Sequence, residues 1–194
     1  MLKRIFDILF SLFALILLSP LFLILSIIIK ISSPGPVFYK GKRMAKGGGI
    51  FYMHKFRSMV TNADKLGTDL TKYEDERITK IGKFLRRTKL DELPNLIDVL
   101  KGDMSIVGPR PESPLYAQHY NERQRRVLDV RPGITGLAQL ENRREDLKLK
   151  DQADPDAYYI NVLMPKKLEI DLFYVENRTF LMDIKIILKT LFCR

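Results

Sequence analysis

The chain has 194 residues, of which 46% are hydrophobic and 29% charged, a mixture typical of a folded core with many surface charges. Its net charge of +10 favours polyanionic partners such as nucleic acid, anionic lipid headgroups or phosphate-rich substrates. The single cysteine, Cys193, excludes a disulfide framework within the chain and fits a reducing compartment.

The first predicted element is an apolar segment from Ile5 to Ile29, in which Asp7 is the only charge. A plain spanning helix is one interpretation, because the segment is long enough to cross a bilayer. Two features favour a re-entrant segment that enters and leaves through one leaflet. Pro20 in its middle removes a helical hydrogen bond, and both flanks are basic, as cytoplasmic flanks are. We therefore expect a helix-break-helix anchor over residues 1–33.

Residues 34–194 are predicted to form one further domain. Short strands are expected at Val37–Tyr39 and Ile50–Tyr52, joined by a turn at Gly47–Gly49. An apolar stripe predicts a helix over Asp75–Lys89. Asp91 is then expected to be the N-cap of the following helix, with Pro94 in its first turn and Gly102 at its end.

The second half of this domain is predicted to be mostly helical. Helical structure is expected from Pro114 to Val130, between rigid loops rich in proline and glycine at Gly108–Pro114 and Arg131–Gly136. A polar loop at Asp151–Asp156 precedes two closing helices, Pro165–Asn177 and Thr179–Phe192. The last of these is amphipathic and could pack on the core or lie in a bilayer interface. The predicted fold class is α+β, mainly α, with a small β-hairpin.

Asp91 and Glu92 form an adjacent acidic pair among basic residues. A capping role alone would account for Asp91, since Asp is a common N-cap. A helix N-terminus and nearby arginines would also hold the carboxylate ionised and attract phosphate. An ionised carboxylate can attack phosphorus and form an acyl phosphate. Glu92 cannot easily point the same way, and it suits a Mg²⁺ ligand because Mg²⁺ takes protein carboxylates together with substrate phosphates.

Several basic side chains are candidate phosphate ligands. Arg110 lies between two prolines, which fix the backbone around a planar bidentate donor; its alternative role is an ion pair with Glu112. Lys55 and Arg57 follow a strand and are expected to point from it together. The substrate-binding residues predicted in this way are Lys55, Arg57, Arg86, Arg110 and Arg143.

Two further motifs carry weaker signals. Asp154-Pro155-Asp156 matches the Asp-x-Asp metal motif of many nucleotide-sugar glycosyltransferases, but the strand–helix alternation of a nucleotide-binding domain is missing before it. His54 and His119 have no partners at metal-ligand spacing.

Taken together, these residues resemble the bacterial sugar transferases, the small monotopic phosphoglycosyl transferases. The resemblance covers nearly the whole chain, and the Asp-Glu and Pro-Arg-Pro blocks in this order are its most specific part. The matching segments are Ser19-Pro20, Pro34–Phe38, Lys55–Met59, Leu90–Pro94, Leu100–Ser105, Val107–Pro111, Arg131–Gly136 and Asp183–Ile187.

The resemblance implies an enzyme that starts glycan assembly on the cytoplasmic face of the bacterial inner membrane. A UDP-sugar would donate its phosphosugar to a polyprenyl phosphate, usually undecaprenyl phosphate, and UMP would leave. By the same resemblance, Asp91 is the nucleophile, Glu92 binds Mg²⁺, and the anchor is re-entrant. The expected partners are the donor, the acceptor and membrane lipids, without nucleic acid; a homodimer stays open.

Departures from the family pattern leave the donor sugar open. Leu137 stands where the family often has Trp, and Glu141-Asn142-Arg143 replaces the common Asn-Gly-Arg, although Arg143 keeps the Arg position. Two alternative functions also remain: an anchored basic module that binds anionic lipid or nucleic acid without catalysis, and a metal-dependent glycosyltransferase using Asp154 and Asp156, which would release UDP.

Overall fold

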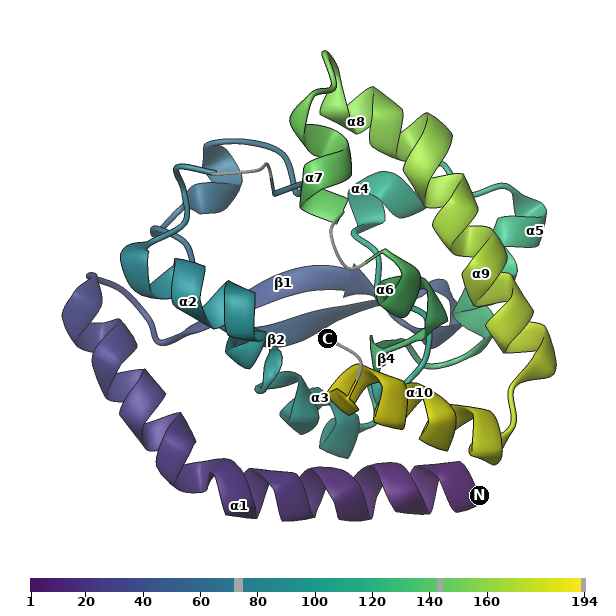
Figure 1. Cartoon of the computed structure of the whole chain (residues 1–194), viewed down its shortest axis with the longest axis horizontal. Helices are drawn as coiled ribbons and strands as arrows, with labels where there is room; N and C mark the ends of the chain where they lie inside the picture. Colours follow the sequence, from purple (N-terminus) through teal and green to yellow (C-terminus); the bar gives the residue numbers. More distant parts are fainter. Residues whose placement is uncertain (72–74, 143–144, 193–194) are drawn as a thin grey trace.

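The computed structural model describes residues 1–71, 75–142 and 145–192, so the predicted Arg143 and the lone Cys193 lie outside the described residues. Helices predominate, and the strands form two short sheets among them (Figure 1). The strands are β1 Phe38–Met44, β2 Ile50–Phe56, β3 Ser105–Val107 and β4 Gly133–Thr135. The α-helices are α1 Leu2–Ser32, α2 Lys80–Thr88, α3 Asn95–Lys101, α4 Pro114–Ala117, α5 Glu122–Arg125, α6 Leu137–Glu141, α7 Glu145–Lys150, α8 Pro155–Tyr158, α9 Met164–Asn177 and α10 Phe180–Phe192. Shorter helical turns are η1 Lys46–Gly48, η2 Ala63–Lys65, η3 Leu90–Glu92, η4 Arg126–Asp129 and the π-helical η5 Tyr159–Leu163.

The long helix α1 runs without interruption from Leu2 to Ser32, with Pro20 inside it. The predicted break is therefore wrong at the level of secondary structure. Instead α1 bends midway (Figure 1). A proline inside a helix causes such a bend without ending the helix when the freed backbone groups find other partners. The Ser19 hydroxyl donates to the Ile16 carbonyl at 2.8 Å next to the bend. Among the described residues, one helix, α1, is both long enough and apolar enough to cross a membrane.

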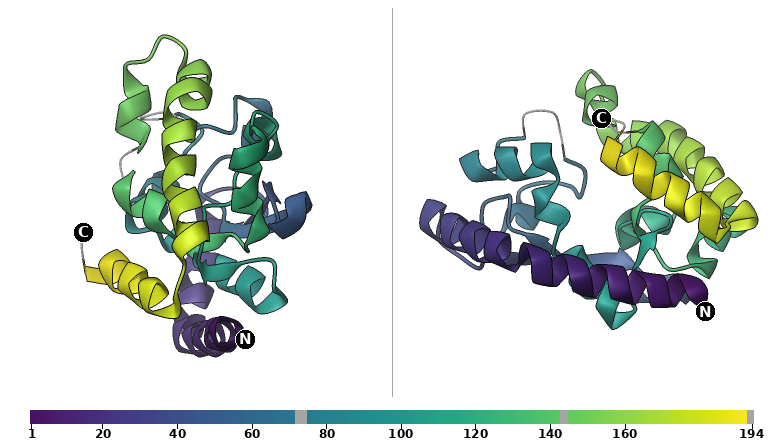
Figure 2. Two further views of the ribbon diagram at one scale, coloured as in Figure 1. Left: turned by 90° about the vertical axis from the view of Figure 1, so that its right-hand side faces the viewer. Right: turned by 60° about the horizontal axis from the view of Figure 1, so that its bottom comes forward.

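Both ends of α1 are attached to the same folded body. At its start, Arg4 donates to the Val99 carbonyl at 2.6 Å, and the buried Asp7 accepts from the Ile106 amide at 3.1 Å. At its end, Arg57 donates to the Ser33 carbonyl at 2.8 Å. The helix accordingly lies along one side of the molecule over its whole length (Figure 2).

Two small sheets frame the centre of the domain. The antiparallel pair β1–β2 is longer than the predicted hairpin, with Tyr39 opposite Lys55 in its register. The parallel pair β3–β4 falls beside and within segments that were predicted to be loops. This parallel pairing depends on glycine, because a Cβ atom on Gly133 would lie 2.1 Å from the Gly108 amide nitrogen. A close approach of two backbones leaves little hydrophobic pattern in the sequence, so these segments were predicted as loops.

The segment around the acidic pair differs from its prediction. Helix α2 begins at Lys80 rather than Asp75, because Thr79 is its N-cap and accepts from the Gly82 amide. The next helix, α3, has Pro94 as its N-cap, so the prediction that Asp91 caps it is wrong. Asp91 instead lies in the middle of the turn η3, which begins directly after Lys89.

In the C-terminal half, the closing helices α9 and α10 confirm their predictions to within a residue. The predicted helical stretch from Pro114 to Val130 divides into α4, α5 and η4, because Asn121 starts a new helix with a capping box. Helix α8 begins inside the predicted polar loop, with Asp154 as its N-cap. Helix α10 packs on the core through Ile186, while Leu188 and Leu191 are exposed.

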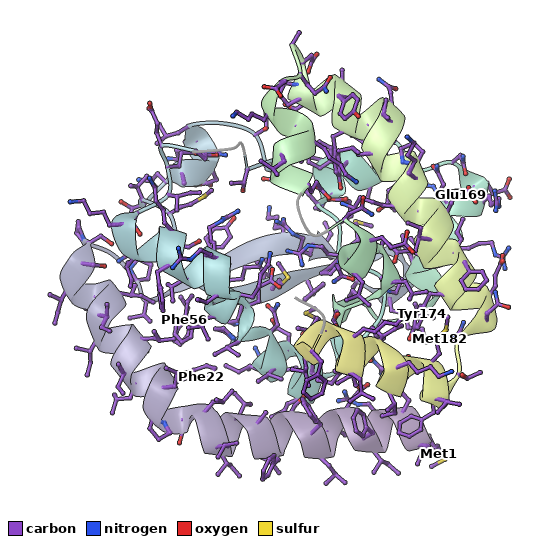
Figure 3. The ribbon with its side chains drawn as sticks, in the orientation of Figure 1. Met1, Phe22, Phe56, Glu169, Tyr174 and Met182 are labelled. Carbon is purple, nitrogen blue, oxygen red and sulfur yellow. The ribbon has the colours of Figure 1, made fainter. Side chains whose placement is uncertain are left out.

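Three hydrophobic clusters hold these elements together. One joins η5 and α9 to α4 and η4. A second joins the hairpin, α3, β3, the C-terminal part of α9 and the middle of α10, with Tyr174 buried in it. The third connects the C-terminal half of α1 to β2 and α2, where Phe22 and Phe56 face each other with ring centroids 5.1 Å apart (Figure 3). The bent half of α1 is thereby packed on the domain.

Candidate active site

Three charged side chains from distant parts of the sequence meet in one ion-pair cluster. Glu92 Oε1 lies 2.8 Å from Lys55 Nζ and 2.6 Å from Arg110 Nη2. Lys55 comes from β2, Glu92 from η3, and Arg110 from the loop after β3. The fold thus brings together three residues that the sequence singled out separately as candidate phosphate or metal ligands.

The backbone around each member is fixed locally. Lys89 ends α2 with a left-handed backbone conformation, φ 60°, which turns the chain into η3. Such a conformation is uncommon outside glycine and asparagine and tends to occur at functional sites. On the opposite side, the Pro109 carbonyl accepts from the Gly133 amide at 2.8 Å, which ties the Pro-Arg-Pro loop to β4.

Asp91 is 5% exposed, and its Oδ1 atom has no hydrogen-bond partner among the described residues. Burial raises the pKa of Asp91 above the usual value; the charge of Lys55 opposes this and that of Glu92 adds to it. Arg86 and Lys89 favour the charged form, as expected for nearby cations, but burial outweighs them in the direction of the shift. Asp91 is a buried acid with a free oxygen beside several cations.

Glu92 has the opposite electrostatic character. Burial disfavours its charged form, but Arg110 and Lys55 together hold the pKa of Glu92 well below its usual value. Burial lowers the pKa of the Lys55 ammonium, and Glu92 opposes that shift. Glu92 raises the pKa of Arg110, so this guanidinium stays charged. The two adjacent carboxyl groups therefore have separate chemical properties, as expected for separate tasks.

The remaining predicted cations lie in different places. Arg86 donates to the Thr71 hydroxyl at 2.8 Å, and it is close enough to Asp91 and Glu92 for their charges to act on its pKa, which burial lowers. Arg57 does not point with Lys55. Its guanidinium instead donates hydrogen bonds to the carbonyls of Ser33 and Pro34, directly after α1.

The alternative roles weighed from the sequence also have structural outcomes. Arg110 pairs with Glu92, and Glu112 instead accepts from the Tyr159 hydroxyl. Asp156 of the weak Asp-x-Asp motif accepts from the Tyr116 hydroxyl at 2.5 Å. His54 lies 2.6 Å from Asp98, a residue with no exposed surface, in a contact between β2 and α3.

The acidic pair fits Mg²⁺ in its chemistry. Hard cations prefer carboxylate oxygens and substrate phosphates, and Mg²⁺ needs only one or two protein carboxylates. Asp91 Oδ1 is buried without a partner, and Glu92 Oε2 has only a long contact of 3.5 Å with Arg110. Glu92 Oε2 would hold such an ion and leave Asp91 Oδ1 free, and no group of three or more His, Cys, Asp or Glu side chains suited to a metal exists among the described residues.

A second polar cluster adjoins Arg110 and was missed from the sequence. Lys167 of α9 lies 2.8 Å from Glu145, and it donates to the Tyr159 hydroxyl at 3.0 Å. Asp171, one turn further along α9, is 6% exposed. The one available signal was a carboxylate on the apolar stripe of a predicted helix, between Leu168 and Val175.

Comparison with known proteins gives a consistent result. The model of a family described as bacterial sugar transferase matches residues 1–194. A UDP-N-acetylgalactosamine-undecaprenyl-phosphate N-acetylgalactosaminephosphotransferase of Aeromonas hydrophila is 38% identical over 97% of this chain and 42% of its own length. A UDP-glucose:undecaprenyl-phosphate glucose-1-phosphate transferase of Escherichia coli (strain K12) is 40% identical over 99% of this chain and 40% of its own.

A shorter relative matches over most of its length. The uncharacterized sugar transferase EpsL of Bacillus subtilis (strain 168) is 37% identical over 97% of this chain and 85% of its own length. The chain thus spans about two fifths of the length of the Aeromonas and Escherichia relatives.

Proposed function

This chain belongs to the bacterial sugar transferase family, and from that premise we propose that it transfers a phosphosugar from a UDP-sugar to undecaprenyl phosphate, releasing UMP. Two relatives carry names for reactions of this kind, with UDP-N-acetylgalactosamine or UDP-glucose as donor. The observation that carries the proposal is Asp91, a buried carboxylate with an unpartnered oxygen beside the Lys55–Glu92–Arg110 cluster.

The reaction proceeds in two displacements at phosphorus. An Asp91 carboxylate oxygen attacks the phosphorus that carries the sugar, a P–O bond forms, and the bond to UMP breaks with its electron pair leaving on UMP. A phosphate oxygen of the lipid then attacks the same phosphorus, and the bond to Asp91 breaks to restore the carboxylate. Dividing the transfer into two steps allows a soluble donor and a lipid acceptor to use one small site in turn.

The cations around Asp91 stabilise the phosphoryl group during both steps. Arg110 presents a fork of N–H donors that suits phosphate oxygens. With a two-fifths exposed side chain, it can reach a bound donor while remaining close to Glu92. Lys55 and Arg86 add positive charge where negative charge develops. Mg²⁺ held by Glu92 would supply further charge neutralisation on the diphosphate.

The anchor is proposed to be re-entrant, with the domain on the cytoplasmic face of the bacterial inner membrane. Arg4 and Asp7 at one end of α1, and Ser33 at the other, contact the same folded body. A domain of this kind cannot lie on both sides of a bilayer at once. The bend at Pro20 would then mark the deepest point of the anchor.

Replacement of Asp91 by Asn tests the mechanism. The amide keeps the size of the side chain but removes the nucleophilic charge, so UMP release should fall by about three orders of magnitude or more. Asp129→Asn, at an exposed carboxylate of η4, is the matched control and should keep full activity.

Incubation of the wild type with UDP-glucose or UDP-N-acetylgalactosamine, without lipid acceptor, should leave a phosphosugar on Asp91 that mass spectrometry detects after rapid quenching. An Asp91→Asn variant that turns over well would refute the covalent mechanism. A wild type that releases UDP instead of UMP would refute the transfer of a phosphosugar.

A further inference from the structure

A buried polar contact between β2 and α3 has no part in the reaction proposed above. Asp98 has no exposed surface, and both of its carboxylate oxygens contact His54. Oδ2 accepts from the His54 backbone amide at 2.8 Å, and Oδ1 lies 2.6 Å from the ring atom Nδ1. Among the described residues, β1 is the only partner strand of β2, so without Asp98 this amide would be an unpaired donor at the edge of the sheet.

Stability alone does not explain an ionisable pair at this position. Met53, next to His54, is buried in the same cluster as Leu96 and Val99 of α3, so apolar packing already joins the two elements. Removing a carboxylate from water costs free energy, and well-packed apolar side chains of similar volume are often at least as stable. The polar pair adds direction, because two hydrogen bonds to one residue fix both its main chain and its ring.

The two partners are each connected to the ion-pair cluster by a short, regular piece of chain. Lys55 directly follows His54 on β2. From Glu92, hydrogen-bonded helical turns continue into α3 and reach Asp98. Two links therefore join the same two segments: the contact of His54 with Asp98, and the ion pair of Lys55 with Glu92 at 2.8 Å.

The position of the Lys55 ammonium depends on the placement of β2. Its side chain is 18% exposed, so neighbouring groups enclose it and limit the conformations that could compensate for a shift of the strand. A displacement of about 1 Å at an active site can lower a rate by up to about 100-fold. A contact that holds β2 in place therefore has a direct effect on where this positive charge lies.

We propose that His54 and Asp98 are positioning residues that fix β2 against α3, so that the Lys55 ammonium stays at ion-pair distance from Glu92 and beside Asp91. The inference rests on the proposed function, in which Lys55 stabilises the transferred phosphoryl group. His54 and Asp98 act only through Lys55 and contact neither the donor nor the acceptor.

Replacement of His54 by Leu or by Asn isolates the ring contact. The two new side chains have similar shapes, but only Asn carries an N–H donor that can replace Nδ1 opposite Asp98. Kinetics are measured on the detergent-solubilised full chain with undecaprenyl phosphate and UDP-glucose or UDP-N-acetylgalactosamine. We expect kcat of His54→Leu to fall about tenfold or more, with little change in KM for the donor, because Lys55 acts on charge that develops during the reaction.

His54→Asn should keep a kcat close to that of the wild type. Tyr52→Leu is the matched control, because Tyr52 is exposed and lies on the same side of β2 as His54, and it should also keep kcat. Wild-type kcat in His54→Leu, or equal losses in His54→Leu and His54→Asn, would overturn the proposal.

A double-mutant cycle tests whether His54 acts through Lys55. Lys55→Met removes the group that the pair positions, so the addition of His54→Leu should then lower kcat by less than about twofold. A loss in this background as large as that in the wild-type background would mean that the two residues act independently, which would overturn the proposal.

Acetylation of lysines, followed by mass spectrometry, tests the positioning without any measurement of activity. An ammonium held by a carboxylate reacts slowly with acetic anhydride, so Lys55 should be acetylated faster in His54→Leu than in the wild type or in His54→Asn. Lys167 is the internal control, because it is also enclosed and lies 2.8 Å from Glu145 in another part of the fold. Equal increases at both lysines would show general loosening, and no increase at Lys55 would show that its position is unchanged; either result would overturn the proposal.

These measurements separate the inference from the proposed function. If Lys55 alone becomes more reactive in His54→Leu but Asp91 of the wild type acquires no phosphosugar, the positioning of Lys55 stands and the covalent mechanism fails. If Asp91 becomes labelled and the losses from His54→Leu and Lys55→Met are additive, the mechanism stands and the positioning fails.

Discussion

Replacing Asp7 by Leu should destabilise the whole domain, although the substitution makes an apolar segment more apolar. Asp7 is 2% exposed, and its two oxygens accept from the Ser105 hydroxyl at 2.9 Å and the Ile106 amide at 3.1 Å. Leucine leaves both donors buried without partners. An unsatisfied buried donor costs about 1–3 kcal/mol, so the two together cost about 2–6 kcal/mol, partly offset by the added apolar surface.

A net loss of about 3 kcal/mol corresponds to about 6–12 °C in the melting temperature of a chain of this size. Thermal unfolding of the purified protein in detergent, followed by circular dichroism, measures it. Ser11→Ala is the matched control, because the Ser11 hydroxyl is buried on the same helix without a partner in the described part of the chain, and its removal leaves no donor there unsatisfied. A melting temperature of Asp7→Leu equal to or above that of the wild type would refute the argument.

The remaining predictions concern the site and the anchor. Arg110→Lys should lose about tenfold or more in kcat/KM, because a point charge does not reproduce the bidentate fork; wild-type efficiency in a folded variant would remove the clamp. Glu92→Gln should weaken both turnover and the response to Mg²⁺, and an unchanged Mg²⁺ titration would remove Glu92 from the metal site. Cysteines at positions 3 and 40, replacing Lys3 and Lys40, should be labelled from the same side of the membrane; labelling from opposite sides would exclude a re-entrant anchor. Asp171→Asn should gain stability over the wild type as pH rises from about 4 to 7, because the raised pKa makes the folded wild type hold a proton that its unfolded chain releases; a pH-independent difference would contradict this.

Periodic segments could be predicted from the sequence because their signal is local. The apolar faces of α9 and α10 repeat at helical spacing, and both helices lie within a residue of their predicted limits. The pairing of β3 with β4 carries no such signal. It depends on the close approach of Gly133 to Gly108. These residues belong to two short segments that several helical turns separate in the sequence.

Sequence motifs single out candidate site residues, but they do not predict how these residues are arranged. The Asp-Glu and Pro-Arg-Pro motifs named Asp91, Glu92 and Arg110, and the last two are in direct contact. The capping role predicted for Asp91 was wrong because it assumed that α3 begins there. The left-handed conformation of Lys89, which no propensity favours, places Asp91 in a separate turn instead.

The packing of the turn that carries Asp91 bears on how the proposed nucleophile would meet a lipid phosphate. The flanking residues Leu90 and Leu93 pack against the cluster that holds Leu25 and Ile29 of α1. The turn carrying Asp91 is therefore supported by the part of α1 proposed to return from the bilayer. Because α1 is fixed at both ends, the distance between this apolar helix and the Asp91 carboxylate is set by packing rather than by a flexible linker. In the proposed mechanism, a membrane-bound acceptor would then need no large movement of either partner to bring its phosphate to a phosphosugar on Asp91.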